Sequence, residues 1–271
     1  TTACVAEARW LAGEGVRELI LVAQDPTAYG EDWGRPGAIC ELLDRLQEID
    51  GIRWIRILYA YPERISDAFI AAMVRNTKVV PYLDLPIQHC DDAVLKAMNR
   101  RGGRKEIEDA IARLRAAIPG ITLRTTLIAG FPGETEEQYA ELCDFVKTVK
   151  FDRLGCFAYS AEENTVAAKM PNQIDEETKQ RRADHIMELQ AEVSAEREGE
   201  KVGHTYECIC DGVDDETGMY LLRTKADCPE IDGNVLTPAD TPLETGAFYK
   251  VTITDSDTYD LYGYAEERLE D

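Results

Sequence analysis

Short apolar runs alternate with amphipathic segments along the first two hundred residues of the chain. The apolar runs have the length and β-branched content of buried strands, and they predict strands at 19–23, 54–60, 79–85, 123–129 and 154–159. The segments between them have helical spacing and predict helices at 6–13, 39–49, 66–74, 91–98, 104–117, 135–149 and 175–198. Strands joined through helices pair in parallel, so the pattern predicts an α/β fold. Five strands suit an open, partial TIM-like barrel, because a closed one needs eight.

The segment 124–137 combines a predicted strand, a glycine-rich loop and a helix start. Thr125–Ala129 has the apolar character of a strand that is buried on both faces. Gly130–Gly133 predicts a turn whose backbone can approach a ligand closely, and Thr135 with Gln138 predicts a capping box. In a parallel α/β fold such a loop lies at the carboxyl end of its strand, where ligand sites are usually built.

The pattern changes beyond residue 200, where turns and acidic residues separate short strand-like runs. These runs predict strands at 205–209, 219–223, 234–236, 248–254 and 261–264. Their number and spacing are typical of a small antiparallel β-barrel. We therefore expect two domains, an α/β domain over residues 1–200 that ends in a long helix and an all-β domain over residues 201–271.

The composition is that of a globular protein, with 44% hydrophobic and 30% charged residues. No apolar run has the length of a membrane span and no signal-peptide pattern is present, so we expect a cytoplasmic protein with no membrane association. The formal net charge is −22, and residues 201–271 contain five Lys and Arg against seventeen Asp and Glu. This acidity favours a basic partner over nucleic acid, although a solvated acidic surface explains the charge equally well.

Eight cysteines are scattered along the chain, several of them inside apolar runs. Cys208 and Cys210 form the only close pair, and alternate residues of a strand point the same way. A metal site there would need further ligands, and no second pair or nearby histidine supplies them. No phosphate-binding loop or dinucleotide-binding glycine pattern is present either.

Several motifs resemble those of the radical S-adenosylmethionine (SAM) methylthiotransferases, in the same order and at similar spacing. They are LVAQDPTAYG (21–30), PYLDLPIQH (81–89), MNRRGGR (98–104), LRTTLIAGFPGETEE (123–137) and CFAYSAEENTVAAKMP (156–171). DCPEIDGNV (227–235) and TDSDTYDLYG (254–263) resemble the C-terminal TRAM domain of the branch that acts on a ribosomal protein, the RimO type. The resemblance covers nearly the whole chain.

The resemblance implies a partial barrel that binds SAM, two [4Fe-4S] clusters in the complete enzyme, and a TRAM barrel that recognises the substrate. The implied reaction adds a methylthio group to the β-carbon of an aspartate in ribosomal protein twelve of the small subunit. The implied partner is this basic ribosomal protein, alone or on the assembled subunit, without direct binding of tRNA. A related enzyme that modifies an adenosine of tRNA and a noncatalytic ribosome-associated module remain as alternatives.

The sequence departs from this family in two respects that decide its chemistry. Members ligate a cluster through a Cys-x3-Cys-x2-Cys loop, and no such spacing occurs here. The family's N-terminal domain with three further cluster cysteines has no counterpart either. We therefore expect a fragment of a longer enzyme that has no catalytic or metal-ligating residue of its own and is inactive alone.

Polar or glycine residues at the predicted strand ends are the candidate cofactor-binding residues. By resemblance, Gln24 and Asp25 meet the methionine part of SAM, although they also suit the start of a turn before Pro26. Gln88 has an amide that can hold both ribose hydroxyls. The backbone of Gly130, Phe131, Pro132 and Gly133 is implied to lie along the adenosine, with a plain tight turn as the alternative. Tyr159 is expected to border the adenine or the substrate pocket, with core packing as the alternative.

Four further residues are candidates for contacts with the substrate. His89 follows Gln88 and equally suits a structural hydrogen bond, and Ser160 follows Tyr159. Arg100 and Arg101 suit an anchor for a carboxylate of SAM or substrate. They equally suit the end of a helix that Gly102 caps. Arg124 begins a strand, away from the usual active face, and is not expected to be catalytic.

Overall fold

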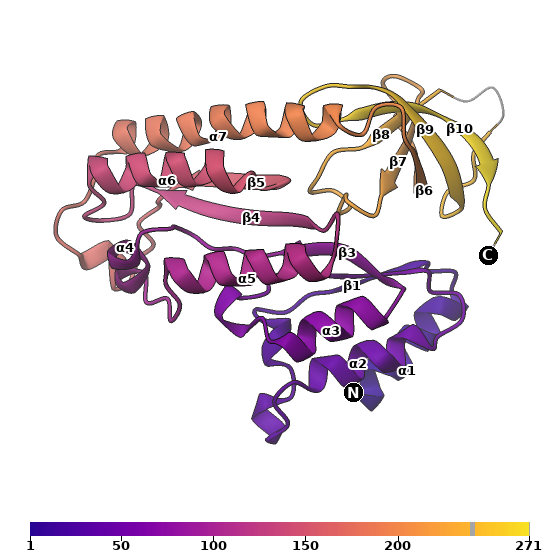
Figure 1. Ribbon diagram of the computed structural model, residues 1–271, viewed down its shortest axis with the longest axis horizontal. Helices are drawn as coiled ribbons and strands as arrows, with labels where there is room; N and C mark the ends of the chain where they lie inside the picture. The colour runs from indigo at the N-terminus through magenta and orange to yellow at the C-terminus, as the bar shows by residue number, and fades with distance from the viewer. Residues whose placement is uncertain (239–241, 271) are drawn as a thin grey trace. The chain divides into compact units, whose positions relative to one another are not determined.

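The computed structural model describes residues 1–238 and 242–270 (Figure 1). Residue contacts divide the chain into two units. The first contains Thr1–Leu58, Ser66–Tyr82 and the residues from Ser194 onward; the second contains Tyr59–Ile65 and Leu83–Val193. One sheet has the strand order β1-β2-β3-β4-β5, and the remaining strands close into a barrel. The predicted domain boundary at residues 200–201 stays a prediction.

The first unit opens with alternating helices and strands, as the apolar pattern predicts. Parallel pairing of β1 and β2 is confirmed, with Leu19 opposite Ile55. Ser66 caps α3 by accepting a hydrogen bond from Phe69 N. The elements are α1 (Thr2–Gly13), β1 (Glu18–Leu21), the 3₁₀ helices η1 (Pro26–Ala28) and η2 (Glu31–Trp33), α2 (Ala38–Gln47), β2 (Trp54–Ile57), α3 (Asp67–Arg75) and the start of β3 (Val79–Asp84).

The second unit carries the loops that form the candidate site. Its elements are η3 (Pro62–Arg64), the end of β3, α4 (Asp92–Ala97), α5 (Arg104–Ala117), β4 (Thr122–Ala129), α6 (Glu136–Val149), β5 (Arg153–Ala158), η4 (Ala167–Lys169) and most of α7 (Glu176–Gly199). Strands β4 and β5 pair in parallel, and α6 and α7 lie side by side next to them (Figure 1). The predicted capping box of α6 is confirmed, since Gln138 N donates to the Thr135 hydroxyl and Thr135 N to the Gln138 side chain.

The expectation that β4 is buried on both faces is wrong. Thr125, Leu127 and Ala129 are buried, whereas Arg124, Thr126 and Ile128 are half-buried. The half-buried face has two uses: Ile128 lines a cavity, and the Arg124 guanidinium lies 3.1 Å from the buried Asp84 carboxylate. One face of β4 is therefore open to a ligand.

The C-terminal strands form a closed barrel in the order β10-β8-β7-β6-β9. The bounds are β6 (Thr205–Val213), β7 (Tyr220–Thr224), β8 (Val235–Thr237), β9 (Phe248–Ser256) and β10 (Leu261–Arg268). The predicted all-antiparallel arrangement needs one correction, because β10 pairs with β8 in parallel. Strand direction cannot alternate all round a closed ring of five, so at least one neighbouring pair has to be parallel.

The Cys208 and Cys210 side chains point into the apolar core of this barrel. Both residues are almost fully buried, and burial raises the pKa of each thiol. Such thiols stay protonated and are poor metal ligands. Among residues 1–238 and 242–270, no three His, Cys, Asp or Glu side chains come together as a metal site.

A buried ionic network joins the barrel to β1 and β2 within the first unit. Glu18 accepts from the Arg56 guanidinium at 2.8 Å and from Arg223 at 2.9 Å, and all three side chains are nearly inaccessible. Arg56 also donates to the Lys225 carbonyl and stacks over Tyr82. Buried charges persist only when paired in this way. Contacts therefore group the barrel with the first strands of the chain.

Glu207 on β6 gives the stability of the first unit a dependence on pH. Burial raises its pKa, but the bonds from Lys225 and Arg53 outweigh burial and hold the pKa below its ordinary value. A lowered folded pKa stabilises the protein above the unfolded pKa of about 4.3, and the gain is lost as the pH falls through the folded pKa. We expect Glu207→Gln to cost about 1 kcal/mol near pH 7 and much less near pH 3. Urea unfolding of both proteins measures this, with the exposed Glu216→Gln as control; an equal cost at both pH values would contradict it.

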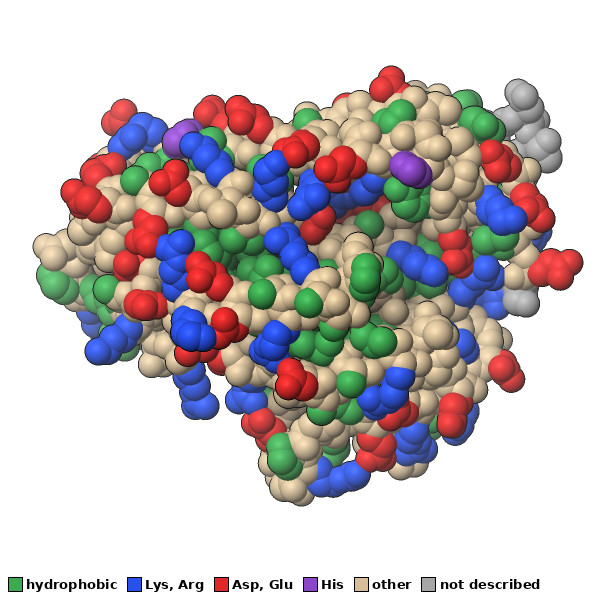
Figure 2. Space-filling model, viewed as in Figure 1, with side chains coloured by type: hydrophobic (Ala, Val, Ile, Leu, Met, Phe, Trp, Pro, Cys, Tyr) green, Lys and Arg blue, Asp and Glu red, His purple; other side chains and the backbone are tan. Residues whose placement is uncertain are grey.

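Charged side chains cover the face of the protein drawn in Figure 2, with red and blue side chains interspersed among green ones. Within the described residues, no helix is both long enough and apolar enough to cross a membrane.

Candidate functional site

A cavity of about 810 Å³ lies at the carboxyl ends of the second unit's strands. Its walls come from α4, β4 and η4, and from the residues that follow β3, α4, β4 and β5. The lining residues are Gln88, Lys96, Ala97, Met98, Asn99, Arg100, Ile128, Phe131, Tyr159, Val166, Ala167 and Met170. The volume suits a nucleoside-sized ligand, and the wall combines apolar surface with a few polar groups, as ligand sites do.

Gly130 fixes the loop that leads to this cavity. Its φ is +76°, and a Cβ added there would lie 2.5 Å from Lys179 Cγ and 3.1 Å from Lys179 Cα. The position therefore requires glycine twice over, once for the left-handed backbone and once for the close approach of α7. Helix α7 acts as the support of the loop.

The Glu134 carboxylate locks the same loop from inside. Both of its oxygens accept from Gly130 N at 3.1 Å, and Arg182 on α7 donates to Oε1 at 2.6 Å. The Glu134 and Arg182 side chains are 0% and 4% exposed, so this is a buried ion pair. Arg182 also donates to Glu136 at 2.6 Å. One carboxylate thus couples the Gly130 loop to α7.

His89 completes this network from the end of β3. It is fully buried, and its Nδ1 accepts from Asp91 N at 3.0 Å. The other ring nitrogen, Nε2, lies 3.3 Å from Glu134 Oε2. Because His89 does not line the cavity, the geometry favours the structural alternative for this residue over a substrate contact.

Phe131 and Tyr159 form an aromatic wall. Their rings pack edge to face with centroids 5.3 Å apart, and the Lys179 ammonium lies 5.3 Å from the centroid of the Tyr159 ring. The Tyr159 hydroxyl is buried and has no hydrogen-bond partner among the described residues. A buried hydroxyl without a partner is costly, which makes it a candidate contact for a ligand.

Gln88 lines the cavity with a strained backbone, since its φ is +69°. Its N–H donates to the Thr126 carbonyl and its own carbonyl accepts from Ile128 N, at 2.9 and 2.8 Å. A non-glycine residue in this region costs free energy, and β4 compensates by holding the backbone on both sides. The side chain is thereby placed at the cavity.

The other candidate substrate residues are not gathered at one point. Arg100 lines the cavity, but its guanidinium already donates to the Pro86 carbonyl and stacks on the Tyr61 ring at 4.6 Å. Arg101 is exposed and does not line the cavity. Ser160 is also exposed, and its hydroxyl oxygen lies 3.4 Å from Glu162 Oε1.

Of the two alternatives for Arg100 and Arg101, the helix end capped by Gly102 is not observed. Helix α4 ends at Ala97, and Asn99 takes the left-handed conformation with φ +60°. Asparagine tolerates this region, so the chain leaves the helix three residues earlier than a glycine cap would allow.

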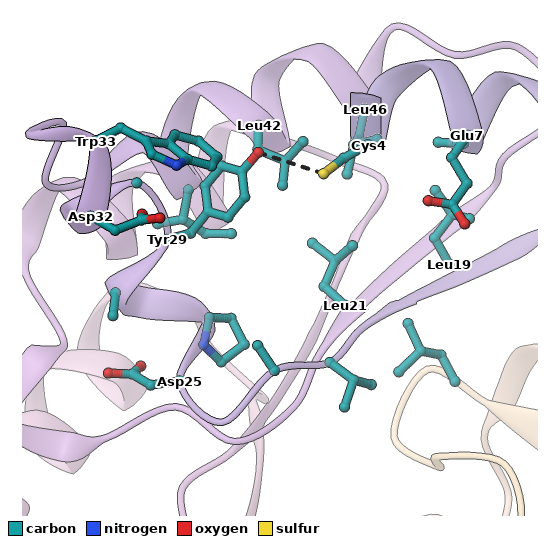
Figure 3. A pocket seen from close by; sticks show the side chains of 18 of the residues that line it. Cys4, Glu7, Leu19, Leu21, Asp25, Tyr29, Asp32, Trp33, Leu42 and Leu46 are labelled. Carbon is teal, nitrogen blue, oxygen red and sulfur yellow. Dashed lines mark hydrogen bonds between the residues drawn. The ribbon is translucent and has the colours of Figure 1, made fainter. Parts of the chain in front are cut away.

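Gln24 and Asp25 belong to the first unit and do not line the cavity of the second. Gln24 is exposed, and Asp25 lines an apolar cavity of about 640 Å³ (Figure 3). Asp25 Oδ1 accepts from Thr27 N at 3.0 Å and so caps η1. The Cys4 thiol and the Tyr29 hydroxyl face each other at 3.5 Å, away from Asp25 (Figure 3). The assignment of Gln24 and Asp25 to SAM remains a prediction.

Three residues of the site were not predicted from the sequence: Glu134, Arg182 and Lys179. Glu134 carried a signal, because an acid directly after a glycine loop is placed to accept its amides. Arg182 and Lys179 lie in a polar helix and carried none.

Two protein families match the sequence. The Radical SAM superfamily matches residues 2–146, and the TRAM domain matches residues 202–265. Ribosomal protein uS12 methylthiotransferase RimO of Pelobacter propionicus is 47% identical over 267 residues, which are 98% of this chain and 59% of that protein. The protein of the same name from Clostridioides difficile is 45% identical over 259 residues, or 96% of this chain and 58% of that protein. The chain thus spans about three fifths of the length of these relatives.

A solved structure also resembles the chain. Coproporphyrinogen III oxidase from Escherichia coli, described as a radical SAM enzyme, aligns with a TM-score of 0.50 and 16% identity. The alignment covers 79% of this chain and 50% of that one. At this level of identity the similarity concerns the fold alone.

Proposed function

Because this chain belongs to the radical SAM superfamily, which matches more than half of it, we propose that it forms the SAM-binding and substrate-recognising part of a methylthiotransferase. The proposed substrate is ribosomal protein uS12, which the names of its relatives specify. The proposed reaction adds a methylthio group to the β-carbon of an aspartate. The proposed activity is that of a longer enzyme, and this chain alone is expected to be inactive.

The cavity of the second unit carries this proposal. Gln88, Phe131 and Tyr159 line this cavity together. The buried Tyr159 hydroxyl has no hydrogen-bond partner among the described residues. These residues fit an adenosine: aromatic rings suit the adenine, and an amide suits the two ribose hydroxyls. The backbone of Gly130–Gly133 would lie along the adenosine. The assignment of Gln24 and Asp25 to the methionine part stays a prediction from the sequence. In the complete enzyme, SAM would supply the radical that removes hydrogen from the substrate carbon once a [4Fe-4S] cluster donates the electron that cleaves it.

The protein's own contribution is positional. Glu134 and α7 hold the Gly130 loop in one conformation. The adenosine would therefore bind a preorganised surface, without a cost for rearranging the loop. The strained Gln88 backbone fixes the direction of its amide. Holding a reactive cofactor in one geometry directs it at one C–H bond and excludes competing reactions.

The residues of this chain do not fit an iron–sulfur cluster. The sequence contains no Cys-x3-Cys-x2-Cys spacing, and [4Fe-4S] clusters are held by thiolates. We expect the purified chain, incubated anaerobically with iron and sulfide, to show no stoichiometric brown chromophore. Stable binding of about four irons per chain would contradict this expectation.

The charge distribution supports a basic protein as the substrate. The acidic residues of 201–271 attract a basic partner and repel phosphate backbones at long range. The tRNA-modifying alternative is opposed by this charge and by the names of the relatives. A complete enzyme that modified tRNA and left uS12 unchanged would overturn the proposal.

Binding of S-adenosylhomocysteine tests the SAM site without any cluster. We expect weak binding by isothermal titration calorimetry at millimolar ligand, and a dissociation constant raised about tenfold by Gln88→Ala. Loss of two hydrogen bonds, each worth about 0.5–1.5 kcal/mol, gives this factor. Gln180→Ala is the control, because Gln180 is exposed on α7, donates to Asp184 and does not line the cavity. Equal affinity of Gln88→Ala and the parent protein would contradict the proposed role.

A further inference from the structure

The ends of β2 and β3 share an unusual backbone feature. Tyr59, two residues after β2, has φ +64°, and Gln88, four residues after β3, has φ +69°. Neither is a glycine, and for a bulky residue this conformation is a true outlier. Strain of this kind gathers at functional positions, where the surroundings over-determine it. Gln88 lines the cavity, whereas Tyr59 has been given no role so far.

A buried carboxylate holds Tyr59 in place. Asp84 is 1% exposed, and its Oδ2 accepts from Tyr59 N at 3.2 Å. The Asp84 carbonyl accepts from Ala60 N at 2.9 Å, and its Oδ1 lies 3.1 Å from the Arg124 guanidinium. The strained turn is therefore fixed by a paired charge of β3 and β4.

The ring of Tyr59 makes few stabilising contacts with the protein. The residue is 42% exposed, and its hydroxyl has no partner among the hydrogen bonds of the described residues. Core packing would explain a buried ring, but it does not explain a strained backbone that displays an exposed one. The strain therefore points to a contact with a bound ligand.

Two residues after Tyr59, the chain packs against a residue that lines the cavity. Tyr61 lies under the guanidinium of Arg100, which lines the cavity and donates to the Pro86 carbonyl. The adenosine positions proposed above are supplied by Gln88, Phe131 and Tyr159, and Tyr59 does not line that cavity. Tyr59 is thus two residues away from a residue that packs on the cavity wall, and it is not one of the proposed adenosine contacts.

We propose that Tyr59 is a specificity-determining residue that packs its ring against the polypeptide substrate. Tyrosine offers a large, rigid, apolar surface with a polar tip, which is why it is enriched at protein interfaces. The Asp84–Arg124 pair acts as the positioning device that presents the ring. This inference rests on the proposed function, because a polypeptide has to reach the rim of this cavity.

Two substitutions separate the ring from the backbone strain. Tyr59→Gly removes the ring and relieves the strain, and Tyr59→Asn keeps a polar side chain that tolerates the left-handed region. We expect both variants to melt at the same temperature as the parent protein or higher. Lys150→Gly is the matched control, since Lys150 has φ +51° at the end of α6 and lies outside the cavity.

The probe is a fluorescein-labelled peptide of uS12 that contains the target aspartate, followed by fluorescence anisotropy. We expect Tyr59→Gly and Tyr59→Asn to raise its dissociation constant at least tenfold and to leave S-adenosylhomocysteine binding unchanged. Tyr59→Phe should retain most of the affinity. Lys150→Gly should raise the melting temperature without changing peptide binding.

Each of the other outcomes would overturn a different part of the proposal. Peptide binding by Tyr59→Gly with the parent affinity would overturn the role of Tyr59 and leave the proposed function intact. Lower melting temperatures for both Tyr59 variants would assign the ring to stability instead. A parent protein that bound S-adenosylhomocysteine but not the peptide would overturn the proposed substrate, and the inference with it.

Discussion

Gly130→Ala is expected to destabilise the protein by about 2–5 kcal/mol and to remove S-adenosylhomocysteine binding. The left-handed backbone costs an alanine about 1–2 kcal/mol, and forcing a methyl group into filled space adds about 1–3 kcal/mol. The atoms in the way include the backbone of Lys179, which cannot rotate aside as a side chain can. Urea unfolding measures the loss, and calorimetry measures the ligand.

Gly133→Ala provides the matched control for this prediction. Gly133 lies in the same loop with φ +84°, but nothing lies within 4 Å of a Cβ built there. It should therefore carry only the backbone cost of about 1–2 kcal/mol. If the two variants lost equal stability, the contact with α7 would not constrain the loop as we describe.

Local chemistry allowed much of the fold to be predicted from sequence. The periodicity of apolar residues located the helices and strands, and α5 was predicted with its observed bounds, Arg104–Ala117. The capping box at Thr135 was predictable because both of its partners lie within four residues. Parallel pairing followed from the alternation of strands and helices.

The site was less predictable, because its decisive contacts are distant in sequence. Arg182 and Glu134 are 48 residues apart, and nothing in the periodicity of α7 marks Arg182 as buried. The strain at Gln88 and Tyr59 was equally hidden, since neither residue type signals a positive φ. The both-face burial expected of β4 failed for a related reason: apolar character does not distinguish a core face from a ligand-facing one.

Breaking the Glu134–Arg182 pair should be the most damaging change to the loop's support. We expect Glu134→Gln and Arg182→Met each to cost about 3–5 kcal/mol, because each leaves the partner charge buried without its counterpart. The double variant removes both charges and should cost less than the sum by about 1–3 kcal/mol. Urea unfolding of the four proteins closes this double-mutant cycle.

Glu136→Gln is the internal control of the same cycle. Glu136 accepts from the same guanidinium at 2.6 Å, but its side chain is 65% exposed, so it should contribute less than about 1 kcal/mol. Additive costs in the cycle would mean that Arg182 stabilises α7 independently of the loop. Restored stability of the double variant without restored S-adenosylhomocysteine binding would instead separate two roles of Glu134. Pairing with Arg182 concerns stability, whereas accepting both bonds from Gly130 N sets the shape of the cofactor wall, and a glutamine has only one oxygen for that task.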